Sequence, residues 1–95
     1  MTEKQRELMR HALGLPNKQK TPYRNHFCIG VGSDGYEEWE ELVSKGLAVR
    51  AIGGANWSGD FFYLTLAGAK AVLLPKEHIS REDAEKMRSL VAVES

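Results

Sequence analysis

Cysteine, proline and uncompensated charge are all scarce in this sequence, and each shortage excludes a class of protein. Cys28 is the only cysteine, so no disulfide can form within the chain, and a reducing compartment is expected. With 3 prolines and 9 glycines among 95 residues, collagen-like and low-complexity chains are excluded. No apolar run approaches the ~20 residues that span a bilayer, and the polar first residues do not resemble a secretory signal. We therefore expect a cytoplasmic protein that contacts no membrane.

The apolar content that is present suffices for one modest core. The chain is 42% hydrophobic and 27% charged, which is ordinary for a globular protein. At this size, folding buries roughly 60–65% of the surface that the unfolded chain exposes. We therefore expect a single domain over residues 1–95, with its core in about residues 3–74 and a C-terminal helix over about residues 80–91.

Charge is balanced in total but uneven along the chain. The 13 basic and 13 acidic side chains give a net charge of zero, which argues against a protein that works by binding phosphate backbones. Residues 1–26 carry six basic and two acidic side chains, whereas residues 33–50 carry two basic and five acidic ones. Such asymmetry indicates either an interaction surface or the docking of one end of the chain on the other.

Hydrophobic periodicity predicts two helices in the first half of the chain. Apolar side chains recur at helical spacing over residues 3–13, before a Gly-x-Pro break. A second helix is predicted over residues 35–45, with Ser33 or Asp34 as its N-cap and Gly46 in a left-handed conformation at its end. The predicted buried face of this helix consists of Tyr36, Trp39, Leu42, Val43 and Leu47.

The segments around the second helix are predicted to be loop and strand. Residues 15–25 form a polar, basic loop, and residues 23–29 are either extended or a turn of helix. Residues 47–52 and 61–66 have the branched and aromatic content of strands, and residues 53–60 between them are turn material. This pattern predicts an antiparallel hairpin with a long tip.

Two further helices are predicted after the hairpin. Thr65 caps a short helix that runs through Leu74 and is ended by Pro75. Ser80 caps a last helix. The inward face of this last helix consists of Ala84, Met87, Leu90 and Val91.

The order of these elements over residues 36–73 carries a first resemblance. A helix, a strand, a glycine-rich loop and a strand are followed by the helix start Thr65-Leu66-Ala67-Gly68. This order resembles the second half of a winged-helix domain, in regulator families that have a leucine-threonine-x-x-glycine helix start. The resemblance implies a single α+β, winged-helix-like domain of helices and a small antiparallel β-hairpin sheet. It also implies DNA binding through the helix N-terminus and the wing.

A second set of residues resembles small uncharacterised proteins that bacteriophages and prophages encode. The set comprises Tyr23-Arg24-Asn25-His26-Phe27, Asp34, Leu42-Val43, Gly46-Leu47 and Thr65-x-x-Gly68, and it spans about residues 5–73. This resemblance implies a phage or prophage origin, and hence the cytoplasm of a bacterial host. It implies no particular activity.

The residue chemistry departs from the DNA binding that the winged-helix resemblance implies. Acidic side chains occupy the start of the predicted recognition helix, where phosphates would approach; they are Asp34, Glu37, Glu38 and Glu41. DNA contacts use arginine, lysine, asparagine or glutamine, and the predicted tip over residues 53–60 contains no lysine or arginine. We therefore retain the architecture and expect no DNA binding through this helix.

Three patterns that suggest chemistry have a simpler interpretation. Residues 30–35 match G-x-G-x-x-G, but the acids there would repel a pyrophosphate, so we expect a flexible turn and no cofactor. His26 and Cys28 project to the same side of an extended segment, as a nucleophile pair requires. No third group is placed beside them by spacing, so a buried cysteine near a partly buried histidine is expected. The three histidines lie on separate elements, and no metal site is expected.

Aromatic side chains in the hairpin form a candidate protein interface, consisting of Trp57, Phe61 and Tyr63. Alternation places Phe61 and Tyr63 on the face of their strand opposite to Phe62 and Leu64. If the Phe62 face packs on the helices, the other face meets a partner protein or lies under the C-terminal helix. Both alternatives stay open at this point.

These features together predict a non-enzymatic accessory protein of the phage type, which acts through a protein partner or as a homodimer. The alternative is a DNA-binding regulator that uses a basic loop face. Its candidate contacts are Lys18, Lys20, Arg24 and Arg50. The two hypotheses differ in whether these four basic residues converge on one surface.

Overall fold

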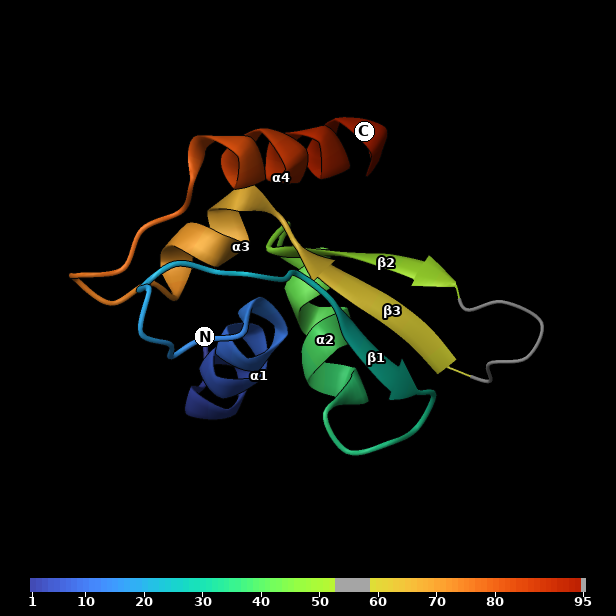
Figure 1. Cartoon of the computed structure of the whole chain (residues 1–95). Coiled ribbons are helices and arrows are strands. Elements are labelled where there is room, and N and C mark those ends of the chain that lie inside the picture. The colour runs from blue at the N-terminus through green and yellow to red at the C-terminus, as the bar shows by residue number, and fades with distance from the viewer. Residues whose placement is uncertain (53–58, 95) are drawn as a thin grey trace.

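The computed structural model describes residues 1–52 and 59–94, and within them the chain forms four helices and one three-stranded antiparallel sheet (Figure 1). The helices are α1 (Glu3–Leu13), α2 (Tyr36–Ser44), α3 (Leu66–Ala71) and α4 (Arg81–Glu94). The strands are β1 (Phe27–Gly30), β2 (Ala48–Ile52) and β3 (Gly59–Leu64). The prediction of one α+β domain is confirmed. In this described part, no helix has the length and apolar character needed to cross a bilayer.

Helices α1 and α2 end in the same left-handed glycine turn. Gly14 has a φ of 76° and Gly46 a φ of 77°. After α2, the Gly46 N–H donates to the carbonyl of Val43 at 3.0 Å, and the Leu47 N–H donates to the carbonyl of Leu42 at 2.9 Å. These two bonds satisfy carbonyls that the end of a helix leaves unpaired. The predicted role of Gly46 is confirmed.

Replacing Gly46 with alanine is expected to lower the free energy of unfolding by about 1 kcal/mol, because a Cβ is strained at positive φ. A Cβ built there meets nothing within 4 Å, so the cost is conformational rather than steric. Lys45→Ala is the control, because Lys45 has an ordinary helical φ of −90°. Urea unfolding measures both variants. A Gly46→Ala protein more stable than the wild type would show that the helix continues through this position.

The start of α2 differs from the prediction. The N-cap is Gly35, with a φ of 99° and no side-chain cap, and Asp34 lies one residue outside the cap position. The Asp34 carboxylate instead accepts a hydrogen bond from Lys4 Nζ of α1 at 2.6 Å. The predicted capping by Ser33 or Asp34 is therefore wrong, because the left-handed turn at Gly35 points the Asp34 side chain toward α1.

The caps of the two later helices follow the prediction. The Thr65 hydroxyl accepts a hydrogen bond from the Gly68 N–H at 3.1 Å, and the Ser80 hydroxyl accepts one from the Asp83 N–H at 3.2 Å. The first of these helices, α3, ends at Ala71 rather than at residue 74. The starts of both helices were therefore predicted correctly from their capping residues, whereas the end of α3 was predicted too late in the chain.

The sheet has the strand order β1-β3-β2, with both pairings antiparallel. The predicted hairpin is the β2–β3 pair, and most of its predicted tip lies outside the described residues. Of the segment over residues 23–29, residues 27–29 belong to β1, and residues 23–26 lead into this strand without regular structure. Asn25 lengthens the β1–β3 ladder by its side chain, which donates to the Leu64 carbonyl at 3.0 Å and accepts from the Leu64 N–H at 2.8 Å.

Most of the core lies between the sheet and the pair α1 and α2, and Ala69 of α3 and Met87 of α4 belong to the same core. In Figure 1, α4 lies across the sheet from α1 and α2. Trp39 and Leu42 of α2 are fully buried, as are Phe62 and Leu64 of β3. The rings of Trp39 and Phe62 stack with centroids 5.3 Å apart. The predicted core positions of Trp39 and Leu42 are confirmed.

A buried ion pair joins α1 to the segment after α3. Arg10 Nη1 and Nη2 donate to the two carboxylate oxygens of Glu77 at 2.6 and 2.8 Å, and the side chains are 13% and 3% exposed. Arg10 also donates to the Val72 carbonyl, and the Leu74 N–H donates to Glu77. Hydrogen bonds from Arg10 hold the pKa of Glu77 at about 2, well below its ordinary value.

Candidate functional site

The predicted aromatic interface lies on the side of the sheet that faces α4. Phe61 and Tyr63 of β3 are half-buried there. Their side chains lie on the opposite face of the sheet from that of Phe62, which is fully buried. Trp57 lies outside the described residues. Val49 of β2, which is paired with Tyr63, is only 7% exposed, and Met87 of α4 is 3% exposed. Helix α4 thus covers the β2 half of this face, and the β1 half is the more open one.

The four predicted basic contacts come from two elements, the loop between α1 and β1 and the strand β2. Lys18 and Lys20 are exposed in the loop between α1 and β1. Arg24 donates to the carbonyl of His11 at the end of α1, from Nε at 3.2 Å and Nη2 at 2.7 Å. Arg50 lies on β2, with its Nε 3.9 Å from the carboxylate of Asp60. Two of the four guanidinium and ammonium groups are therefore held in contacts within the chain.

His26 and Cys28 lie at the free edge of the sheet. β1 pairs with β3 on one side, and both side chains are exposed, so the prediction of a buried cysteine is wrong. The reason is that alternate residues of β1 face away from the helices, on a strand that has no second strand partner among the described residues. Both side chains line the same hollow at this edge.

The backbone of β1 also presents polar groups to this edge. The His26 N–H donates to the Ala12 carbonyl of α1 at 3.2 Å rather than to β3. In an antiparallel pair, both backbone groups of one residue point to the same side, and neighbouring residues alternate. The N–H and C=O of Cys28 therefore point away from β3, whereas those of Ile29 point toward it.

Two hollows adjoin this edge, and together with it they form what we call the β1-edge groove. The first has a volume of about 230 Å³, and the second has about 330 Å³. The first is lined by His11, Arg24, His26, Phe27 and Cys28, and the second by Lys4, Glu7, Leu8, His11 and Phe27. His11 and Phe27 are common to both, and their rings meet edge to face with centroids 5.6 Å apart. The two hollows thus adjoin at the His11–Phe27 contact, between α1 and β1.

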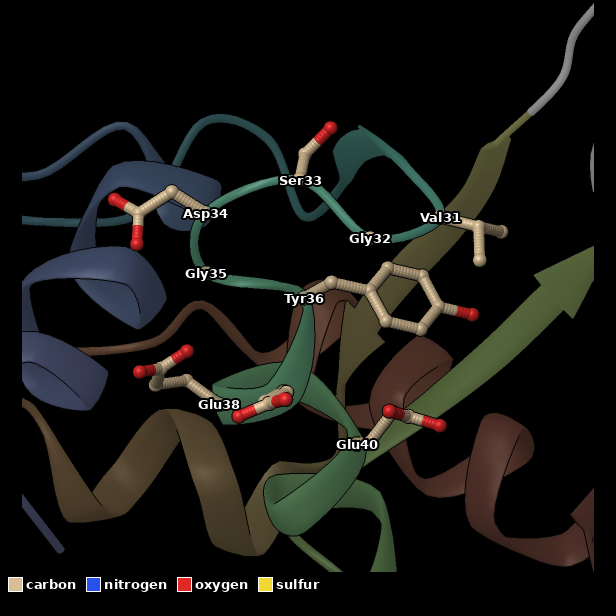
Figure 2. Close-up of a pocket in the computed structure, with 9 residues that line it drawn as sticks. Val31, Gly32, Ser33, Asp34, Gly35, Tyr36, Glu38 and Glu40 are labelled. Atoms are coloured by element: carbon tan, nitrogen blue, oxygen red, sulfur yellow. The ribbon is translucent and has the colours of Figure 1, made fainter.

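The glycine-rich segment forms the loop between β1 and α2 and lines an acidic hollow of about 520 Å³ (Figure 2). Gly32 and Gly35 have φ values of 83° and 99°, as the predicted turn requires. Figure 2 shows the carboxylates of Glu38 and Glu40 on α2 and that of Asp34 on the loop before it. Their negative charge opposes a phosphate at this helix N-terminus.

A buried polar contact beneath this loop was not foreseen from the sequence. The Tyr36 hydroxyl of α2 donates to the carboxylate of Asp60 of β3, and both residues are 7% exposed. This hydrogen bond raises the pKa of Tyr36 above its ordinary value. The contact fixes the start of α2 against the start of β3. Only the tertiary pairing of residues 24 positions apart could have revealed it.

Comparison with known proteins adds no relative. No protein-family model matches the chain, and neither a curated protein nor a solved structure matches it. In the part of the chain that the structure describes, no three histidine, cysteine or acidic side chains are grouped so as to hold a metal ion. The geometry of the β1-edge groove therefore makes it the candidate site.

Proposed function

We propose that this chain is a phage-type accessory protein that acts by binding another protein, without catalysis. The observation that carries the proposal is the β1-edge groove, where an open strand edge lies beside half-buried apolar side chains. Leu8 and Phe27 are half-buried there, and Val31, directly after β1, is 66% exposed. An open strand edge with adjoining apolar hollows is a recurrent means of protein recognition.

The finer architecture is part of the same proposal: a winged-helix-like chain in which α2 leads directly into the β2–β3 hairpin. Its support is the order α2, β2, β3 and α3, together with the Thr65 cap at the start of α3. A helix-turn-helix joins its two helices by a turn of about 3–4 residues. Here β1 lies between α1 and α2, so the likeness applies to the half of the chain that bears the hairpin.

DNA binding through α2 is disfavoured by charge. Replacing Glu37 and Glu38 together with lysine is expected to create weak, salt-sensitive and sequence-blind duplex affinity that the native protein lacks, because phosphate contacts become available. Glu82→Lys with Glu85→Lys on α4 is the matched control, since it changes the net charge equally on another surface. Fluorescence anisotropy with a mixed-sequence duplex at low salt measures all three proteins. Tight binding by the native protein that the α2 lysines leave unchanged would place DNA on another face.

The proposed function is tested by affinity enrichment from a nuclease-treated lysate of a prophage-carrying bacterium. Any enriched protein is then purified and mixed with this chain for sedimentation analysis. We expect a heterologous protein that forms a complex of fixed stoichiometry in the absence of nucleic acid. A chain that sediments as a monomer with every candidate, while it retards duplex DNA, would overturn the proposal in favour of the regulator.

A further inference from the structure

We propose that the β1-edge groove binds an extended, acidic segment of the partner protein, which adds to β1 as a further strand. The inference rests on the proposed function and specifies which surface acts and what chemistry it recognises. It has three independent supports: the direction of the backbone groups of β1, the position of the apolar hollow, and the charge around the groove.

The backbone of β1 supplies the hydrogen bonds for an added strand. The Cys28 N–H and C=O point to the free edge, because the N–H of His26, two residues earlier, points away from β3 and residues two apart point to the same side. An extended peptide beside β1 would therefore exchange a pair of main-chain hydrogen bonds with Cys28. Main-chain bonds of this kind supply affinity in strand addition, and side-chain pockets supply specificity.

The apolar hollow lies where an inward side chain of the added strand would point. Leu8 of α1 and Phe27 of β1 line it, and both pack against the hydrophobic core while remaining half-buried. Phe27 is held in place by Trp39, whose ring centroid is 5.3 Å away. The pocket is thus preformed, and it accepts one aliphatic or aromatic side chain of the partner.

The charge at the other end of the groove selects an acidic segment. Arg24 is held beside the groove by its bonds to the His11 carbonyl and lies over the Tyr23 ring, 5.3 Å from its centroid. His11 and His26 line the same hollow and are exposed. No carboxylate lines this hollow among the described residues, so an aspartate or glutamate next to the apolar anchor would pair with Arg24.

A second copy of this chain fits the edge less well. β1 is four residues long, and a β1–β1 contact between copies would have little area beside the ~1,000 Å² that a specific interface needs. The carboxylates of Asp34 and Glu38 are already paired with Lys4 of the same chain, which lines the groove, so they are not free to enter the groove of a second copy.

The test is a selection of random peptides displayed on phage against the intact protein, followed by titration of synthetic copies of the enriched peptides. Cys28→Pro is the edge variant, because proline is tolerated where the N–H faces away from the sheet but cannot donate to an added strand. Cys28→Ser keeps the edge and is its control. His26→Glu places a carboxylate in the groove, and Lys70→Glu places one on the exposed surface of α3, outside the groove.

We expect the enriched peptides to carry an apolar residue and an aspartate or glutamate at the next position on the same face of the extended peptide. Their affinity should fall at least about tenfold in Cys28→Pro and about fivefold in His26→Glu, and stay within about twofold in both controls. Equal enrichment by the wild type and Cys28→Pro, or peptides without acidic residues, overturns the assignment. If Cys28→Pro does not fold, the difference in peptide affinity between His26→Glu and Lys70→Glu decides the outcome. Self-association of the wild type that Cys28→Pro abolishes would show that the edge binds a second copy of this chain. A partner protein that binds all four variants equally would refute this inference and leave the proposed function standing.

Discussion

Replacing Glu77 with glutamine is expected to lower the free energy of unfolding by roughly 3 kcal/mol at neutral pH, because the change leaves the Arg10 charge buried without its partner. The two side chains are 13% and 3% exposed, so water screens the pair little. Urea unfolding measures the loss. Glu82→Gln, at an exposed position of α4, is the matched control and should cost about 0.5 kcal/mol or less.

The same pair makes stability depend on acid. The pKa of Glu77 is about 2 in the folded chain against an ordinary 4.5, so the folded state favours the charged carboxylate. The stabilisation is therefore complete above about pH 4.5 and is lost as the pH falls toward about 2. Between about pH 7 and about pH 3, the wild type should lose more stability than Glu77→Gln does. Identical pH dependence in both proteins would contradict the buried pair.

Replacing Leu42 with alanine is expected to cost on the order of 2–5 kcal/mol, because the removed methyl groups leave a cavity in a packed core. Leu42 is fully buried on α2, beneath the face of β3 that carries Phe62 and Leu64. Leu74→Ala makes the same chemical change at a side chain that is 52% exposed, and should cost about 0.5 kcal/mol or less. Thermal and urea unfolding compare the two. Equal losses would show that the buried face of α2 is assigned wrongly.

The parts of the fold that local chemistry determines were predictable from the sequence. Helical periodicity gave α1 with its observed bounds, and Gly46 was recognised because a left-handed turn at a helix end favours glycine. Thr65 and Ser80 were recognised because their hydroxyls accept a hydrogen bond three residues on. In each case, the deciding interaction spans only a few residues.

The parts that depend on contacts between distant residues were not predictable. Arg10 and Glu77 are 67 positions apart, and nothing near either residue indicates their pairing. Asp34 was assigned to the wrong partner because Lys4, 30 positions away, takes its carboxylate. Cys28 was predicted to be buried because free cysteine is usually a buried residue type. The strand order β1-β3-β2 instead places it on an edge of the sheet. The candidate site therefore emerged only from the topology.

Amide hydrogen exchange at β1, followed by NMR, tests most directly whether this edge is open for a partner. In the free protein we expect the Cys28 amide to exchange at least about tenfold faster than the Ile29 amide, because only the latter points toward β3. Addition of an enriched peptide or of the partner protein should then protect Cys28 and leave Ile29 unchanged. A Cys28 amide already as protected as Ile29 in the free chain, or unprotected in the complex, would contradict strand addition at this edge.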